Sequence, residues 1–482
     1  MPADQPPQNF EASPPRPRGR PGLAWCAILL LVAGVVVLQY LPRQRVGPNE
    51  NALAGLTFDL QVRMMVGLSD LVRDVPGQRQ QIYAQALQFN TGPPAQRLRF
   101  VPLAAELSDP ETALELLDRW ERDFPAAPAE GGPLEDQPSE DQLLAWRLLD
   151  SLYGDYAAGN WTAPSLSPED RAWLETELGF AGRLALHPAE GPDAAARAAL
   201  LGSASRLAVG FYGGIGGFAC LGLLGLAGLI ALLAFAGAGR LRSALAPPSD
   251  RGGIYAETFA VWLLLLLTIS FAAGVVFPGS LLAGGLAMAI SLLAVAYPLL
   301  RGVPWSEVRK DIGWTGGAGL RELPAGLAAY AMMLPLAGLG LIVTMLLLLL
   351  ANAVSGSVQT PMHPIAPQVP GAEPWTMAVV LLVASAIAPL VEETMFRGFL
   401  YRHLRDATWG LGGAKSFVVS SLIGGLLFAA MHPQGMLAVP ALTSIAVGLT
   451  VAREWRGTLL PSMIAHGIHN GVLMLLLFSI AG

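Results

Sequence analysis

The sequence predicts an all-α membrane protein, a polytopic helical bundle of about nine spans with an α-helical extramembrane domain after the first span. Of the 482 residues, 53% are hydrophobic and only 14% are charged, whereas soluble globular chains carry about 25% charged residues. The apolar residues also gather in long runs, and most of the charge lies in a single interval between the first run and the rest.

The charge and cysteine content restrict the function further. The net charge is -6, and this acidic excess argues against a nucleic-acid partner or a polybasic lipid anchor. The two cysteines, Cys26 and Cys220, lie inside apolar runs. There they are expected to act as small hydrophobic side chains, because neither run has the pattern of a disulfide framework or a metal site.

The N-terminus reads as a short tail followed by a membrane anchor. Residues 1–21 are rich in proline, contain Arg16, Arg18 and Arg20, and lack apolar periodicity, so we expect a disordered basic tail. Residues 22–41 form an apolar run long enough to cross a bilayer core of about 30 Å. A cleaved signal peptide is the alternative. The run ends in Gln39-Tyr-Leu-Pro-Arg43 without a small-x-small cleavage site, which favours an uncleaved anchor.

Residues 42–206 are predicted to form an acidic, mainly helical domain outside the membrane. The interval has 24 Asp and Glu side chains against 14 Arg, a balance typical of a solvated region. Apolar residues recur at helical spacing in 112–120 and 142–152, and Ser167-Pro168-Glu169-Asp170 has the cap, proline and early acids that open a helix. A helical repeat array is the alternative, but no period near 34 residues is present.

Residues 207–482 are predicted to form an eight-span bundle, because eight further apolar runs follow the acidic interval. These runs are 207–236, 259–277, 281–300, 327–351, 377–396, 417–431, 437–451 and 459–480. The runs at 417–431 and 437–451 are short, so one of them could be broken or re-entrant.

The loops between the runs predict the orientation in the cell membrane. Basic side chains gather in alternate loops, at Arg240, Arg242, Arg251, Arg301, Arg309, Lys310, Arg321, Arg402, Arg405, Lys415, Arg453 and Arg456. The opposite loops, 277–279 and 352–374, are almost free of Lys and Arg. The positive-inside rule therefore places the N-terminus in the cytoplasm and residues 42–206 outside it, together with the C-terminus.

Ionisable side chains within the last spans are candidates for function, because each costs about 2.5–3.5 kcal/mol to insert into a membrane. The first group is Glu392, Glu393 and Arg397. Glu393 and Arg397 stand at i and i+4 with the acid first, the favourable order for a helical ion pair. Glu392 would then be the freer carboxylate. The alternative is that these charges only mark the membrane surface at the end of the run.

Two further groups follow on later spans. At i and i+4, Phe428 gives His432 an apolar wall, although a His before Pro433 could simply end a helix. His466 and Asn470 share a helical face suited to two hydrogen bonds to an oxyanion, unless they serve helix packing. His469 lies to one side and could face the site or a neighbouring helix.

Taken together, Glu-Glu-x-x-x-Arg, Phe-x-x-x-His and His-x-x-x-Asn on successive spans resemble the signature of the CAAX-protease and bacteriocin-processing family, which includes type II CAAX prenyl endopeptidases. All three motifs match without substitution over about the last 110 residues. The resemblance implies an intramembrane glutamic endopeptidase. Glu392 and His432 would activate the attacking water, His466 and Asn470 would form the oxyanion hole, and Glu393, Arg397 and Phe428 would support them.

The expected activity is hydrolysis of a membrane-associated or exported protein or peptide at a membrane-embedded, cytoplasm-facing site, without a cofactor. Two alternatives remain open. One is a zinc metalloprotease that uses Glu392, His432 and His466 as ligands, although no His-Glu-x-x-His motif occurs. The other is a non-catalytic membrane scaffold or immunity protein. The acidic domain could hold a partner protein, and the substrate cannot be read from the sequence.

Overall fold

The computed structural model describes residues 19–40, 49–125, 138–240, 243–245, 248–249, 251–355 and 372–481. Within these residues the chain is helical and contains no strand, and nine stretches are long and apolar enough to cross a membrane. The predicted fold class, a polytopic helical bundle, is therefore confirmed. The predicted basic tail at 1–21 lies almost wholly outside the described residues, as does most of the loop predicted at 352–374.

The chain divides into two compact units, of which residues 46–218 make up nearly all of one. Its helices are α2 (Asn49–Leu71), α3 (Gln78–Ala86), η1 (Leu87–Phe89), α4 (Pro94–Leu107), α5 (Pro110–Asp123), α6 (Glu140–Ala157), α7 (Pro168–Leu178), α8 (Phe180–Leu186) and the first part of α9 (Ala194–Gly237). Helix α4 lies at the centre and contacts α2, α3, α5, α6 and α8. The predicted start of α7 is correct, since the Ser167 hydroxyl accepts a hydrogen bond from the Asp170 N–H at 3.1 Å.

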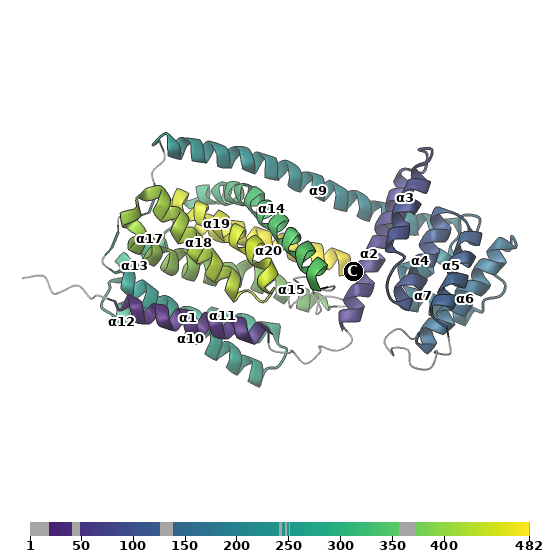
Figure 1. Cartoon of the computed structure of the whole chain (residues 1–482), viewed down its shortest axis with the longest axis horizontal. Coiled ribbons are helices and arrows are strands. Elements are labelled where there is room, and N and C mark those ends of the chain that lie inside the picture. Colours follow the sequence, from purple (N-terminus) through teal and green to yellow (C-terminus); the bar gives the residue numbers. More distant parts are fainter. Residues whose placement is uncertain are drawn as a thin grey trace, which may run out of the picture. The chain divides into compact units, whose positions relative to one another are not determined.

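The second unit comprises residues 1–45 and 219–479 and holds the remaining helices (Figure 1). These are α1 (Pro21–Tyr40), α10 (Gly252–Val276), α11 (Leu281–Ser291), η3 (Leu292–Ala296), α12 (Tyr297–Leu300), α13 (Trp305–Ile312), η4 (Gly319–Arg321), α14 (Glu322–Ser355), α15 (Pro374–Leu382), η6 (Val383–Ile387), α16 (Ala388–Glu392), η7 (Glu393–Leu400), α17 (Tyr401–Thr408), η8 (Trp409–Leu411), α18 (Gly413–Met431), η9 (Met436–Ala438), α19 (Val439–Arg456) and α20 (Leu460–Ala481). Helix α19 packs between α14 and α18.

Two predicted span boundaries are wrong. The span expected at 377–396 continues without a break to Leu411, and the next one begins at Gly413 rather than at 417. Arg402 and Arg405 suggested the membrane surface, yet both are buried in the bundle, where Arg402 pairs with Asp406 and Arg405 with Glu454. A charge that is paired inside the protein does not mark the end of a span. Helices α18 and α19 are each continuous, and both are long enough to cross a membrane.

The first span is part of the bundle, because α1 packs against α10 and α18. Ala24, Ile28 and Val32 recur at i, i+4 and i+8 and are 3%, 0% and 7% exposed. The Trp25 indole N–H donates to Nε2 of His403 at 2.8 Å. At the other end of the helix, the Gln39 amide donates to the Ala430 carbonyl in the last turn of α18 at 3.2 Å. Helix α1 therefore forms one wall of the bundle.

We predict that Ile28→Ala lowers the free energy of unfolding by about 2–5 kcal/mol, because it leaves a cavity between α1 and its neighbours. The matched control is Leu30→Ala on the same helix, where the side chain is 75% exposed and the expected change is within about 0.5 kcal/mol. Denaturant titration of the purified protein in detergent measures both. Equal effects would mean that α1 does not pack as described.

Candidate active site

The long span that carries Glu392 contains two π-helical segments. Segment η6 covers Val383–Ile387, η7 covers Glu393–Leu400, and Glu392 is the last residue of the short α-helix between them. Pro389 has no N–H to give to Ser385, four residues earlier, so the α-helical hydrogen-bond ladder is interrupted there. π-helical turns are rare and often lie at functional sites.

Two helical segments of equal length, one on each side of Gly412, bring His432 close to Glu392. Glu392 and Leu411 are nineteen positions apart, and so are Gly413 and His432. At a rise of 1.5 Å per residue, each of these two segments is about 29 Å long. Gly412 makes the turn between them with φ of 85°, a conformation that favours glycine. The runs predicted at 377–396 and 417–431 would put Glu392 near the turn and His432 at the far end of the next span, whereas in the structure the two residues are equally far along the chain from Gly412.

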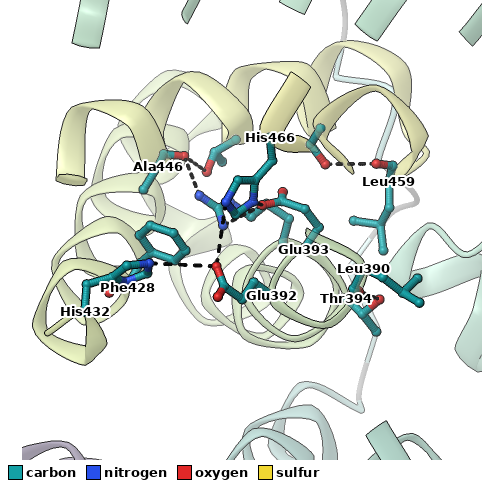
Figure 2. Close-up of polar contacts among 12 residues, drawn as sticks. Leu390, Glu392, Glu393, Thr394, Phe428, His432, Ala446, Leu459 and His466 are labelled. Carbon is teal, nitrogen blue, oxygen red and sulfur yellow. Dashed lines mark hydrogen bonds and ion pairs between the residues drawn. The ribbon is translucent and has the colours of Figure 1, made fainter. Parts of the chain in front are cut away.

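Glu392, His432 and His466 converge from three spans (Figure 2). Glu392 Oε2 lies 3.9 Å from His432 Nε2 and 3.8 Å from His466 Nε2. This carboxylate oxygen is buried and makes no hydrogen bond to any described residue. Both gaps are too long for a direct hydrogen bond, but a single water molecule fits such a distance and can bond to the groups on either side.

The ring of His432 is oriented by the end of its own helix. Helix α18 ends at Met431, and His432 Nδ1 lies 2.7 Å from the Phe428 carbonyl oxygen. Since a carbonyl can only accept, Nδ1 carries the hydrogen, and Nε2 of the neutral ring is an acceptor that faces Glu392. Helix α18 therefore ends directly before His432, as the alternative interpretation of this residue predicted. The hydrogen bond at this helix end also turns the imidazole toward the Glu392 carboxylate.

Glu393 and Arg397 form the predicted i, i+4 ion pair. Glu393 Oε1 lies 2.9 Å from Arg397 Nη1, and the two side chains are 0% and 3% exposed. The guanidinium also donates to the Ala446 carbonyl of α19 at 3.3 Å, and it lies over the Phe428 ring of α18, 4.6 Å from its centroid. The pair thus joins three spans.

The carboxylate of Glu393 also holds His466. His466 Nδ1 lies 2.9 Å from Glu393 Oε1, so the ionised carboxylate accepts the hydrogen of Nδ1 and directs Nε2 toward Glu392. The sequence predicts only a supporting role for Glu393. Its contact with His466 could not be read from the sequence, because the two residues lie 73 positions apart and on different spans.

Asn470 and His469 make contacts away from Glu392. The Asn470 amide donates to the Ala384 carbonyl in η6 at 2.8 Å. The His469 ring faces Tyr330 of α14, with 6.2 Å between the ring centroids, which settles the question of its direction. Asn470 nevertheless has a second N–H on the same nitrogen, and one such donor is enough to bind an oxyanion.

Aromatic rings surround the polar groups. The Phe428 centroid lies 4.1 Å from that of His432 and 5.2 Å from that of Phe396, so the predicted apolar wall is present. Phe396 in turn contacts Phe259 and Trp262 of α10 edge-on, at 5.2 and 5.6 Å. Rigid packing of this kind fixes the rotamers of the groups that it encloses.

In the described part of the chain, no group of three or more His, Cys, Asp and Glu side chains has an arrangement that could hold a metal ion. The residues suggested as zinc ligands, Glu392, His432 and His466, are nevertheless the three that converge.

Fold and site together define a polytopic membrane protein with a buried Glu/His cluster where three spans meet. Residues 374–472 match the family model described as Type II CAAX prenyl endopeptidase Rce1-like. This match covers about a fifth of the chain, and it agrees with the resemblance that the motifs suggested. All candidate site residues lie inside this match, whereas α1 and residues 46–218 lie outside it. No curated protein and no solved structure matches the chain.

We predict that Arg397→Met lowers the free energy of unfolding by about 3–5 kcal/mol, because it leaves the Glu393 carboxylate buried without its cation. Lys415→Met, at an exposed position in α18, is the matched control and should change it by no more than about 0.5 kcal/mol. Adding Glu393→Gln to Arg397→Met should recover part of the loss, since no unpaired charge then remains. Strictly additive losses in denaturant titration would show that the two residues are not coupled.

Proposed function

We propose that this protein is an intramembrane endopeptidase in which Glu392 and His432 activate water for attack on a peptide bond. The observation that carries the proposal is the convergence of Glu392 with His432 and His466 from three spans. The carboxylate has a buried oxygen with no hydrogen bond to any described residue, and both imidazoles present Nε2 to it within 4 Å. The membership of residues 374–472 in a peptidase family supports the same reading.

In the proposed first step, a water molecule lies between Glu392 and His432 and gives one hydrogen bond to each acceptor. The water oxygen bonds to the carbonyl carbon of the substrate while Glu392 takes a proton, and the carbonyl electron pair moves onto its oxygen. In the second step the electron pair on the oxyanion re-forms the C=O bond, the C–N bond breaks with its electrons on nitrogen, and the nitrogen receives the proton from Glu392. The products are a free amine and a carboxylic acid.

The oxyanion needs hydrogen-bond donors, and we assign these to His466 and Asn470. His466 would donate from Nε2, while the Glu393 carboxylate, 2.9 Å away, accepts the hydrogen on Nδ1. Asn470 would use the N–H that does not bond to Ala384. Losing one oxyanion donor typically costs about 3–4 kcal/mol in the barrier, so Asn470→Ala should reduce kcat strongly while leaving the fold intact.

We predict that Glu392→Gln reduces hydrolysis by about 100-fold or more, because the amide keeps the size of the carboxylate but cannot take a proton from water. The assay uses the purified protein in detergent with a fluorogenic peptide, together with Glu373→Gln as the matched control at an exposed residue of the same segment. Full activity of the Glu392→Gln variant would remove Glu392 from the mechanism.

The same assay decides between a water activated by Glu392 and His432 without a metal and the zinc alternative. A strong chelator should leave the wild-type activity unchanged if no metal takes part. If the chelator abolishes activity and added zinc restores it, the three convergent residues act as metal ligands instead.

We further propose that residues 42–206 lie outside the cytoplasm, because the basic segment 301–321, with Arg301, Arg309, Lys310 and Arg321, would lie on the other side, and that this acidic region binds a substrate or partner protein. The orientation predicts the labelling of single cysteines in intact cells after Cys26 and Cys220 are replaced by alanine. A cysteine at Ala189 should react with an impermeant maleimide, and one at Ser306 should react only after lysis; both positions are exposed. The reverse pattern would mean that the topology is inverted.

A further inference from the structure

The first helix, α1, is bonded to both arms of the helical hairpin that carries the two water-activating residues. One arm is the segment from Glu392 to Leu411, which includes α17, and the other is α18, which leads to His432. Helix α1 packs against α18 and makes one side-chain hydrogen bond to each arm. It lies outside the matched residues 374–472, so its contacts with the hairpin are not part of the family domain.

The N-terminal end of α1 is bonded to the arm that carries Glu392. The Trp25 indole N–H donates to His403 Nε2 at 2.8 Å, and His403 Nδ1 lies 2.7 Å from the Gly252 carbonyl oxygen of α10. Since a carbonyl can only accept, Nδ1 carries the hydrogen, and Nε2 of the neutral ring is the acceptor for Trp25. Both ring nitrogens of His403 are thus bonded, and the side chain is 4% exposed. This arm is therefore fixed against α1 and α10.

The C-terminal end of α1 is bonded to the last turn of α18. The last four carbonyls of a helix have no partner within the helix. In α18, His432 bonds to the Phe428 carbonyl through Nδ1 at 2.7 Å and to the Ala429 carbonyl through its backbone N–H at 3.1 Å. The Gln39 amide donates to the next carbonyl, that of Ala430, at 3.2 Å. Gln39 therefore completes the helix end that orients the His432 ring.

Apolar packing holds α1 in this position. Five side chains lie on one face of the helix at spacings of three or four residues, namely Trp25, Ile28, Val32, Val36 and Gln39. The three aliphatic ones pack in the same buried cluster as Phe428, the ring beside His432. By contrast, the neighbouring Leu38 side chain is 60% exposed. Because both polar contacts belong to one packed helix face, α1 fixes the two arms of the hairpin relative to each other.

We propose that α1 is a positioning element of the active site, in which Gln39 is the positioning residue that keeps His432 within one water molecule of Glu392. This inference rests on the proposed peptidase function. Glu392 Oε2 and His432 Nε2 are 3.9 Å apart, a gap that one water molecule can bridge. Without Gln39 the Ala430 carbonyl loses its partner, and the last turn of α18 is free to change its conformation. A shift of about 1 Å in His432 would then be enough to slow the reaction strongly.

A helix that served only as a membrane anchor would not require this amide. An apolar run of about 20 residues is sufficient to cross the bilayer, and a polar side chain on the packed face is unfavourable unless it is hydrogen-bonded. Gln39 is on that face and has its partner in Ala430. In this protein the catalytic unit therefore extends beyond residues 374–472 and includes α1.

The test measures kcat and KM of full-length variants in detergent with the fluorogenic peptide, and kcat is calculated for the folded fraction found by size-exclusion chromatography. Gln39→Leu removes the donor and should lower kcat about fivefold or more while KM stays within about twofold, because the chemical step is affected and not binding. The matched control exchanges two neighbours, Leu38→Gln together with Gln39→Leu, which keeps the composition but moves the amide to the exposed side. It should be as slow as Gln39→Leu alone.

A second comparison separates positioning of His432 from a general effect on the bundle. If Gln39 acts through His432, adding Gln39→Leu to His432→Ala should leave the residual kcat of that variant unchanged. A further loss of about fivefold in this background would overturn the inference. So would a kcat of Gln39→Leu within about twofold of the wild type, or recovery of kcat in the exchange variant; none of these results would affect the role of Glu392. If the wild type is no faster than Glu392→Gln, the proposed function fails and this inference fails with it.

Discussion

Glu393 and Arg397 form an ion pair that is almost completely withdrawn from solvent, and several parts of the bundle depend on it. The carboxylate orients His466 on α20, while the guanidinium contacts the Ala446 carbonyl on α19 and the Phe428 ring on α18. Removing either charge would leave the other buried and uncompensated, which is far more costly than removing both. The pair therefore sets the relative positions of the spans that carry the candidate catalytic groups.

The position of Glu392 follows from this arrangement. The neighbouring Glu393 carboxylate is already paired with Arg397 and His466. Glu392 faces two imidazole nitrogens that are each slightly too far away for a direct hydrogen bond. Two adjacent carboxylates thus have different surroundings and different expected roles, one structural and one chemical. The first span contributes from outside the family match, because Gln39 bonds to the carbonyl of Ala430, two residues before His432.

Much of the fold could be predicted from the sequence, because membrane spans depend on local composition. The number of spans, the helices of the acidic region and the ion pair between Glu393 and Arg397 all follow from short-range patterns. The errors came from long-range contacts. Arg402 and Arg405 looked like residues at a membrane surface, and only the positions of Asp406 and Glu454 in the folded bundle explain why they lie inside it.

The sequence proposes the residues of the candidate site, but it could not predict their geometry. Helical spacing put Phe428 beside His432, yet nothing in the sequence placed Glu393 against His466 or turned Asn470 toward Ala384.

The central claim is that Glu392 and His432 act on one water molecule. A double-mutant cycle tests it most directly, with kcat/KM measured for wild type, Glu392→Gln, His432→Ala and the double variant on one peptide. If both residues serve the same water, the double variant should be about as slow as the slower single variant, because residues that act as a unit give non-additive losses. Losses that multiply in the double variant would contradict the account, since the two side chains would then contribute independently.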